Sequence, residues 1–354
     1  MDIEYGPIKD IKTSKSVYND EETEFSNVKK NESNPINEIF EHIKDTNVSE
    51  DFEISNLCKS GSVGKVYNGR FKKVKNSKLV ALKFLLKQKY EDIAEISIHA
   101  KLKHKNIPNV YGYYKINNGS CIAMEHIKYG DLSNFKKTYL KKKCLSESLI
   151  CYLSYQILDA ILYLHMNKII HLDIKPQNIL IDDFLNVKLT DFSISYNYKS
   201  SKKDIILPKA GTSYYISPEV LNEKKIKVSE ASKIDIYSFG VLLYVLAFND
   251  YPYELINVKS TDYEEISKNI KEKTLQFPKN NGHSNMFKNF VKKCLEKDIK
   301  NRYNIYEAMN DPWIRAHKKL LDEKEKLVNG SKYLINMMTD SIYEFNDFVK
   351  KKIK

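Results

Sequence analysis

The stretch that decides the fold reads His171-Leu-Asp-Ile-Lys-Pro-Gln-Asn178 and is followed, thirteen residues after its last residue, by Asp191-Phe-Ser193. Residues 179–181 and 187–190 between the two motifs are short apolar runs, and the polar residues 182–186 separate them. This pattern predicts a pair of strands joined by a turn. The order of acids, lysine and asparagine around the strand pair indicates a catalytic loop rather than a loop with two unrelated aspartates.

The residue types in these motifs suit the transfer of a phosphoryl group. That reaction needs metal ions held against phosphates, a positioned hydroxyl and compensation of negative charge. Asp173 can accept the proton of a substrate hydroxyl, and Lys175 is close enough along the chain to meet the transferring phosphate. Asn178 and Asp191 offer oxygen ligands for Mg²⁺. The sequence therefore predicts Asp173 and Lys175 as catalytic residues and Asn178 and Asp191 as metal ligands.

With these motifs the chain resembles the eukaryotic protein kinase superfamily of the Ser/Thr type, over roughly residues 52–315. The resemblance implies an α+β, bilobal protein-kinase fold with a small β-rich N-lobe and a larger α-helical C-lobe, and it implies ATP and Mg²⁺ as cofactors. The expected organisation is an acidic, largely disordered N-terminal extension (1–50), the N-lobe and hinge (51–126), the C-lobe (127–315) and a Lys-rich helical tail (316–354).

The resemblance also implies a nucleotide site in the N-terminal half. Val80-Ala-Leu-Lys83 resembles the strand whose lysine holds the α- and β-phosphates, and Glu95 matches the acid that pairs with this lysine. Both are therefore counted with the catalytic residues. Met124 and Glu125 match the gatekeeper and the hinge. The residues expected to contact the nucleotide are Lys59, Gly61, Gly64, Val66, Ala81, Lys83, Met124, Glu125 and Leu180.

Further landmarks follow in the C-terminal half. Gly211-Thr212 and Ser217-Pro-Glu219 match the substrate-docking loop and its anchor, and the resemblance implies that Glu219 pairs with Arg302. Asp235 is expected to hold the backbone of the catalytic loop. Lys175 together with Thr212 implies Ser or Thr rather than Tyr as the acceptor, and protein substrates as partners.

Subfamily signals conflict. Glu95-Ile-Ser-Ile-His99 resembles Polo-like kinases, whereas the segment 211–221 resembles calcium/calmodulin-type kinases. The subfamily is therefore left open.

Three positions depart from the kinase pattern. Lys59 replaces the first glycine of the loop Lys59-Ser-Gly-Ser-Val-Gly64, in which Gly61 and Gly64 permit close approach of the backbone to phosphates through their tolerance of unusual dihedrals. Ser193 replaces the glycine after Asp-Phe. Serine pays more than glycine for a positive φ angle, so we expect this loop to flip its Phe less readily. Leu172 replaces the arginine that usually receives a phosphate added to the activation loop.

The activation loop agrees with the last substitution. No hydroxyl residue lies between Ser201 and Thr212, and Pro208 stands where a phosphorylated residue is usual. We therefore expect an activity that does not depend on phosphorylation of this loop.

Two alternatives stay open at this point. Lys59, Leu172 and Ser193 are the kind of loss expected of a pseudokinase scaffold that binds nucleotide and partner proteins without transfer. Retention of the base, the lysines and both metal ligands argues against that reading. A kinase for a lipid or a small molecule is disfavoured by the peptide-docking elements.

The charge of the chain limits the partners that are expected. The net charge is +12, but residues 1–50 hold 12 acids and 6 lysines, so residues 51–354 carry +18. No nucleic-acid motif accompanies the charge, so no nucleic-acid partner is expected. The sequence has no run of about 18 apolar residues, so no membrane span is expected.

The five scattered cysteines read as free thiols, which indicates a cytoplasmic or nuclear protein. A monomer is expected, and Asp131 suggests a weak preference for a basic residue upstream of the acceptor.

Residue composition, turn residues and apolar spacing predict the main elements. Strands are expected at 52–58, 63–67 and 79–84, and a helix at 36–43. Longer helices are expected from the N-cap Ser146 to Leu164 and through 234–246. Apolar residues of the tail, beginning with Trp313 and Ile314, are expected to dock on the C-lobe rather than to bind a partner.

Overall fold

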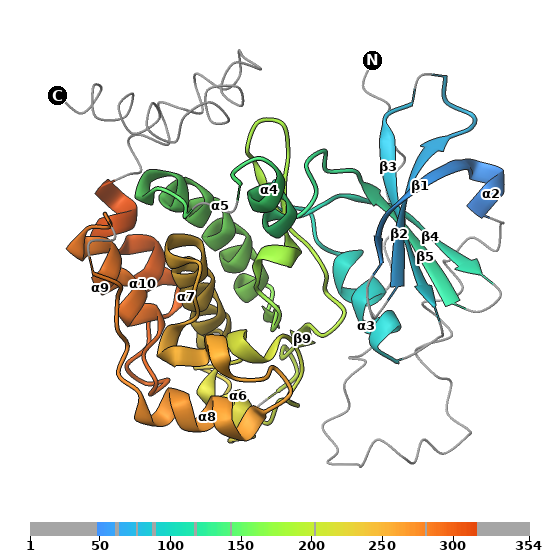
Figure 1. Ribbon diagram of the computed structural model, residues 1–354. Coiled ribbons are helices and arrows are strands. Elements are labelled where there is room, and N and C mark those ends of the chain that lie inside the picture. Colours follow the sequence, from blue (N-terminus) through green and yellow to red (C-terminus); the bar gives the residue numbers. More distant parts are fainter. Residues whose placement is uncertain are drawn as a thin grey trace. The chain divides into compact units, whose positions relative to one another are not determined.

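The computed structural model describes residues 48–316, except for 61–63, 76, 87–89, 117–118, 142–143, 202 and 280–281 (Figure 1). The chain divides into two compact units. Unit 1 contains the described residues up to His104 together with Pro108–Ile127, and unit 2 contains Lys105–Ile107 and the described residues from Lys128 onward. The predicted N-terminal extension, the helix at 36–43, Gly61 and the tail beyond residue 316 lie outside the described residues.

Unit 1 is built on one antiparallel sheet of five strands (Figure 1). The strands are β1 (Phe52–Ser60), β2 (Gly64–Phe71), β3 (Leu79–Leu86), β4 (Val110–Ile116) and β5 (Gly119–Glu125). Their spatial order is β1-β2-β3-β5-β4. The strands are rich in Val, Ile, Leu, Tyr and Phe, the residues that fit a pleated, half-buried surface. The three strands predicted in this part of the sequence are confirmed, with ends that move by a few residues.

The two faces of this sheet carry separate core clusters, since side chains alternate between faces along a strand. One cluster contains Val48, Phe52, Val80, Leu82, Tyr114, Cys121 and Ala123, with Val48 supplied by α2 (Val48–Asp51). The other contains Leu85, Ile96, Ala100, Tyr113, Ile122 and Met124, with Ile96 supplied by α3 (Tyr90–His99). Neighbouring residues of a strand point to opposite faces, so Lys83 lies on the face opposite Leu82, which is the face that α3 covers.

Unit 2 is mainly helical. Its helices are α4 (Leu132–Thr138), α5 (Glu147–Met166), α6 (Pro218–Leu221), α7 (Lys233–Phe248), α8 (Tyr263–Glu272), α9 (Asn285–Cys294) and α10 (Ile305–Asn310), with short 3₁₀ helices η1 (Pro176–Asn178), η2 (Ser213–Tyr215) and η3 (Pro252–Asn257). A β-sheet unit and a helical unit confirm the predicted α+β fold.

The two long helices form the centre of unit 2. Ser146 caps α5 by accepting a hydrogen bond from the backbone N–H of Leu149 at 3.4 Å, as predicted. α7 is buried around almost its whole circumference and packs against α5 and α9. It ends at Asn249, which adopts the left-handed conformation. Among the described residues α5 is the one helix long and apolar enough to cross a membrane, but its apolar residues are buried within unit 2, as in the core helix of a folded domain.

Three short antiparallel strand pairs position the loops of unit 2. β6 (Ile169–Ile170) pairs with β9 (Tyr196–Asn197), β7 (Ile179–Ile181) with β8 (Val187–Leu189), and β10 (Asp204–Ile205) with β11 (Ile226–Lys227). The β7–β8 pair is the strand pair predicted between the two decisive motifs. The β10–β11 pair was not predicted.

The start of the predicted tail docks on unit 2. Trp313 is fully buried, and its ring lies 5.1 Å from that of Phe287 and 5.0 Å from that of Phe290 on α9. Its indole Nε1–H donates to Glu147 at 2.8 Å. Docking is thus confirmed for Trp313 and for Ile314, which is also buried. The later tail residues lie outside the described residues.

Candidate active site

In unit 1 the predicted ion pair between Lys83 and Glu95 is present. Lys83 Nζ donates to both carboxylate oxygens of Glu95, at 2.6 and 2.8 Å. Glu95 is only 1% exposed and Lys83 only 9%. A buried charge is tolerated when a partner of opposite charge satisfies it, so this contact fixes the lysine of β3 to α3.

Four of the residues predicted to contact a nucleotide lie on one face of the unit 1 sheet. Val66 lies opposite Lys83 across the β2–β3 pair, and Ala81 lies opposite Met124 across the β3–β5 pair. Direct partners in an antiparallel pair point to the same face, and Ala81 and Lys83 are two residues apart on β3, so these four side chains share one face. Lys59 lies opposite Val66 in the β1–β2 pair and is exposed.

The structure also shows what surrounds Glu125 and Gly64, two further residues predicted to contact the nucleotide. Glu125 is held at the end of β5 because its carboxylate accepts from the backbone N–H of Asn109 at 3.1 Å and from the Asn109 amide at 3.3 Å. Gly64 does not have a positive φ angle, so an unusual backbone dihedral does not explain this glycine, and its close approach to phosphates stays a prediction. A Cβ atom at Gly64 would overlap the carbonyl oxygen of Phe84, so the close approach of β2 to β3 is what requires glycine.

In unit 2 the predicted base Asp173 is the centre of a hydrogen-bond network. Its Oδ2 lies 2.6 Å from Lys175 Nζ and accepts from Asn178 Nδ2 at 2.8 Å. Its Oδ1 accepts from the backbone N–H and from the hydroxyl of Thr212, both at 3.2 Å. Lys175 Nζ also donates to Thr212 Oγ1 at 2.6 Å. The structure thus brings together Asp173, Lys175, Asn178 and Thr212, which are separated by up to 39 positions in the sequence.

The predicted metal ligands lie at one end of the β7–β8 pair. Asn178 directly precedes β7, and its carbonyl accepts from the backbone N–H of Thr190 at 3.0 Å, which places Asp191 one residue beyond. Both hydrogen bonds of the Asn178 amide nitrogen go to Asp173, at 2.8 Å each, which leaves the amide oxygen as an acceptor. An amide oxygen and a carboxylate fit Mg²⁺, which commonly takes one or two protein oxygens and completes its shell with water and phosphate.

Leu180 follows on β7 in unit 2. Its backbone pairs with Lys188 and bridges to Asp131 on the other side. Asp131 caps α4, since its carboxylate accepts from the backbone N–H of Asn134 at 2.9 Å.

Asp235 holds the catalytic loop from behind, as predicted. Its carboxylate accepts from the backbone N–H groups of His171 and Leu172, at 2.9 and 3.0 Å. Asp235 is fully buried, which by itself raises its pKa, but the hydrogen bond from His165 at 2.8 Å and the charges and N–H groups around it hold the pKa of this carboxyl below its ordinary value. The Asp235 carboxylate is therefore a fixed negative anchor for the loop that carries Asp173.

His171 links the catalytic loop to the second motif. Its Nδ1 accepts from the backbone N–H of Asp173 at 3.2 Å, and its Nε2–H donates to the carbonyl of Thr190 at 3.1 Å. Its ring lies 5.2 Å from the fully buried ring of Phe192. One side chain thereby sets the spacing between Asp173 and Asp191.

The positive φ angle considered for Ser193 is found at other residues. Ser193 is not among the residues with positive φ, whereas Asp191 has a φ of 71° and Leu172 a φ of 68°. Asp is one of the few non-glycine residues that enter the left-handed region with some ease. The left-handed turn falls at Asp191, two residues earlier, so a positive φ at Ser193 is not the reason for a less readily flipped Phe192, and the reduced flipping stays a prediction.

The predicted anchor of the docking loop is also present. Arg302 binds Glu219 through both terminal nitrogens, at 2.6 and 2.9 Å. Arg302 is 1% exposed and Glu219 5%. This two-pronged contact fixes the start of α6 and, through it, the loop that carries Thr212.

Two features of this site were missed in the sequence. His165 lies at the end of α5, and nothing near it in the sequence indicates its contact with Asp235. Ile205 and Leu207 are 5% and 1% exposed. The apolar run 205–207 inside an otherwise polar loop was a usable signal for an anchor of the activation loop.

Comparison with known proteins agrees with this geometry. A family model described as "Protein kinase domain" matches residues 52–314. The chain is 30% identical over 273 residues to CBL-interacting protein kinase 10 of Oryza sativa subsp. japonica, a match that covers 75% of this chain and 57% of the relative. It is 30% identical over 272 residues to an Aurora kinase of Debaryomyces hansenii, covering 75% of this chain and 62% of the relative. Aurora kinase C of Mus musculus is 28% identical over 274 residues, covering 75% of this chain and 92% of the relative.

These relatives come from different kinase groups, so they do not single out a subfamily. The chain spans 57% and 62% of the first two relatives. The match of the family model to residues 52–314, together with the five-stranded sheet, the helical unit and the motifs in their order, gives one assignment. The chain belongs to the eukaryotic protein kinase superfamily.

Proposed function

We propose that this protein is a Ser/Thr protein kinase that transfers the γ-phosphate of ATP to hydroxyl groups of protein substrates. The network of Asp173, Lys175, Asn178 and Thr212 is the observation that carries the proposal. It provides a proton acceptor, a cation and a hydrogen-bonded docking residue within one unit, which is the set that phosphoryl transfer needs.

Each group has a distinct role in this proposal. Asp173 accepts the proton of the substrate hydroxyl as the oxygen–phosphorus bond forms. Lys175 neutralises negative charge on the transferring group. Thr212 holds both side chains and lies where an aliphatic acceptor would approach. Lys83, fixed by Glu95, holds the α- and β-phosphates.

Magnesium fits the proposed site. Asn178 and Asp191 would hold Mg²⁺, which neutralises charge on the phosphates when bound. The remaining residues proposed to contact ATP are Lys59, Gly61, Gly64, Val66, Ala81, Met124, Glu125 and Leu180.

We also propose that activity does not require phosphorylation of the activation loop. The β10–β11 pair joins this loop to the segment after α6, and a further backbone hydrogen bond, from Val228 to Lys203 at 3.0 Å, extends it. The buried side chains of Ile205, Leu207 and Ile226 support the same segment. Leu172, where a phosphate-binding arginine is usual, is only 8% exposed. Burial of apolar side chains would therefore order the loop in place of an arginine–phosphate contact.

We propose a substrate preference from Asp131 and a cellular location from the cysteines. A protein substrate with a basic residue upstream of its acceptor would place that residue near Asp131, whose carboxylate carries a negative charge besides capping α4. Free cysteines suit a cytoplasmic or nuclear protein, which we propose to act as a monomer.

The test is transfer of labelled phosphate from ATP with Mg²⁺ to casein, myelin basic protein and the protein itself. Transfer to Ser or Thr that Asp173→Asn abolishes is expected. A melting curve would show whether the purified protein is folded. Absence of phosphate transfer by folded protein would overturn the proposal.

A second pair of variants tests the regulatory part. Ser200→Ala/Ser201→Ala removes the hydroxyls at the start of the loop and is expected to leave activity unchanged. Ile205→Asp should reduce activity strongly, because it buries an unpaired charge where the loop is anchored. Loss of activity in the Ser200→Ala/Ser201→Ala protein would refute the proposed independence from phosphorylation.

A further inference from the structure

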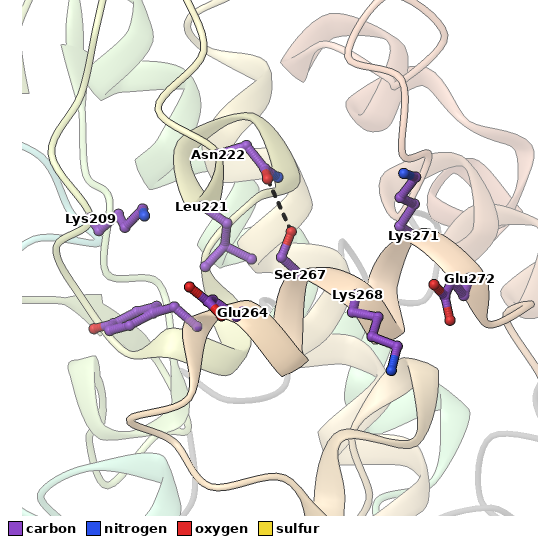
Figure 2. Close-up of a pocket in the computed structure, with 9 residues that line it drawn as sticks. Lys209, Leu221, Asn222, Glu264, Ser267, Lys268, Lys271 and Glu272 are labelled. Carbon is purple, nitrogen blue, oxygen red and sulfur yellow. Dashed lines mark hydrogen bonds between the residues drawn. The ribbon is translucent and has the colours of Figure 1, made fainter.

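A groove of about 480 Å³ lies between α6 and α8 in unit 2 (Figure 2). Its lysines are matched by acids: Lys209 lies 3.8 Å from Glu223, and Lys268 lies 3.9 Å from Glu265. Two further glutamates line the walls beside one further lysine. The charges of the groove therefore select no ligand of either sign.

An apolar strip on the sheet of unit 1 has a clearer chemical character. It consists of Ile54 and Leu57 on β1, Tyr67 on β2 and Phe84 on β3. Ile54 is 40% exposed and Leu57 50%, and the two aromatic side chains are half-buried. Exposed apolar side chains that lie together on a folded unit mark a surface that another segment or protein covers.

The four side chains of the apolar strip share one face of the sheet. Leu57 lies opposite Tyr67 in the β1–β2 pair, and the ring of Tyr67 meets the ring of Phe84 edge-on at 5.5 Å. Ile54 lies opposite Gly69, two residues from Tyr67 on β2, and so belongs to the same face. Phe84 packs against the core cluster that contains Phe52. The strip is therefore the open border of that cluster.

The chain enters the described structure at this same cluster. Val48, the first described residue, is 2% exposed and packs within the cluster. Residues 36–43 end five positions before Val48, a span of at most about 18 Å. Leu57 follows Phe52 by five positions on β1, a distance of about 17 Å along a strand. Residues 36–43 are thus tethered within reach of the strip.

Residues 36–43 have the composition that the strip requires. Their apolar side chains recur at helical spacing, and the helix expected from this pattern lies outside the described residues. A helix of this length gains most of its stability from packing of its apolar face rather than from its own hydrogen bonds. The residues of that face are Ile36, Ile39, Phe40 and Ile43.

We propose that the apolar strip binds residues 36–43 of the same chain as a short helix, with Ile39 and Phe40 against Ile54 and Leu57. The tether favours this occupant over a second copy of the chain, because a short linker gives an effective concentration of about millimolar. The inference does not depend on the proposed kinase function.

Disulfide trapping in the full-length protein tests the contact. The exposed native thiols are removed by Cys58→Ser/Cys144→Ser, and the three remaining native thiols are buried. One cysteine is then introduced on the strip, by Leu57→Cys or, in a separate protein, by Ile54→Cys.

The second cysteine is introduced in the segment, by Phe40→Cys or by Glu41→Cys. Glu41 is the matched control, because it follows Phe40 by one residue and a helix turns by about 100° per residue. Under mild oxidation by copper phenanthroline, Phe40→Cys should form the intramolecular disulfide with at least one strip cysteine about tenfold faster than Glu41→Cys, since the bond needs Cβ atoms within about 4.5 Å. Mass spectrometry of proteolytic fragments measures the rates.

The outcomes of the trapping experiment are distinct. The two loops differ in length by one residue, so a segment without a docked face would give equal rates. Equal rates at both strip positions, or no disulfide at all, would overturn the proposal. Disulfides that join two molecules and disappear on dilution would assign the strip to a second copy of the chain and would overturn it as well.

Hydroxyl-radical footprinting of the protein with its native cysteines supplies an independent measurement. Ile39→Asp/Phe40→Asp should release the segment and raise the labelling of Leu57 by about twofold, because a packed interface excludes water from its centre. Asn37→Asp/His42→Asp adds the same charge outside the apolar face and should leave the labelling unchanged. Identical labelling in the unaltered chain and in both variants would contradict the docking of residues 36–43.

Discussion

Replacement of Arg302 by methionine should destabilise unit 2 strongly. The guanidinium is 1% exposed and binds both oxygens of Glu219. It also donates from Nε to the carbonyl of Glu296 at 2.9 Å and from Nη1 to the carbonyl of Lys233 at 3.1 Å. Its charge lies 4.9 Å from the ring centre of Tyr237. Methionine keeps the volume and removes all these interactions.

The main cost comes from Glu219, which stays buried without its partner. Loss of one member of a buried ion pair costs about 3–5 kcal/mol. For a unit of 150–250 residues, 1 kcal/mol corresponds to a shift in Tm of about 2–4 °C, so we expect Tm to fall by about 6–20 °C. The double variant Glu219→Met/Arg302→Met removes both charges and should be more stable than Arg302→Met alone, by about 2 kcal/mol or more.

Intrinsic fluorescence measures this transition in the right unit. Trp313 is the only tryptophan of the chain and is buried in unit 2. Arg315→Met is the matched control, since Arg315 is exposed and its guanidinium donates to the side chain of Asn310 at 2.8 Å. Its Tm should change by less than about 3 °C. A shift for Arg302→Met no larger than for this control, or a double variant as unstable as the two single losses added together, would refute the reasoning.

Three further predictions concern the site and the thiols. Gly211 has a φ of 102°, and a Cβ atom there would lie 3.0 Å from the carbonyl oxygen of Leu172. Gly211→Ala should therefore destabilise the fold by about 1–3 kcal/mol and reduce phosphate transfer. Melting curves measure the first effect and initial rates of transfer the second. Because the pKa of Asp235 lies below its ordinary value of 3.8, the unfolded chain takes up this proton first as the pH falls, so stability is lost from about pH 5 downward. Denaturant titrations at several pH values should therefore show a flatter dependence for Asp235→Asn, and equal slopes would contradict the prediction. An alkylating reagent should modify the exposed Cys58 and Cys144 in the native protein. The buried Cys121, Cys151 and Cys294 should react only after unfolding, because burial raises the pKa of these three thiols. Mass spectrometry of labelled peptides would reveal any earlier reaction of the buried cysteines.

The sequence alone predicted the parts that depend on local pattern. The strands of unit 1 could be found because they are short runs rich in β-forming residues with polar or Gly-containing turns between them, and α5 because apolar residues recur at helical spacing after a capping serine. The motif around Asp173 could be interpreted because its residue types and their order match the chemistry of phosphoryl transfer. The pairs Lys83–Glu95 and Glu219–Arg302 were inferred from a family resemblance, and the observed contacts agree.

Only the tertiary structure decided which distant groups meet. His165 and Asp235 are 70 positions apart, and Lys175 and Thr212 are 37 positions apart. No local pattern reports such contacts, because the folding of whole helices and strands against one another brings these residues together. The same holds for the β10–β11 pair, for the groove between α6 and α8, and for the left-handed turn at Asp191 instead of Ser193. Residue type determines what a side chain can do, whereas packing of the core determines which backbone angle it adopts and which partner it reaches.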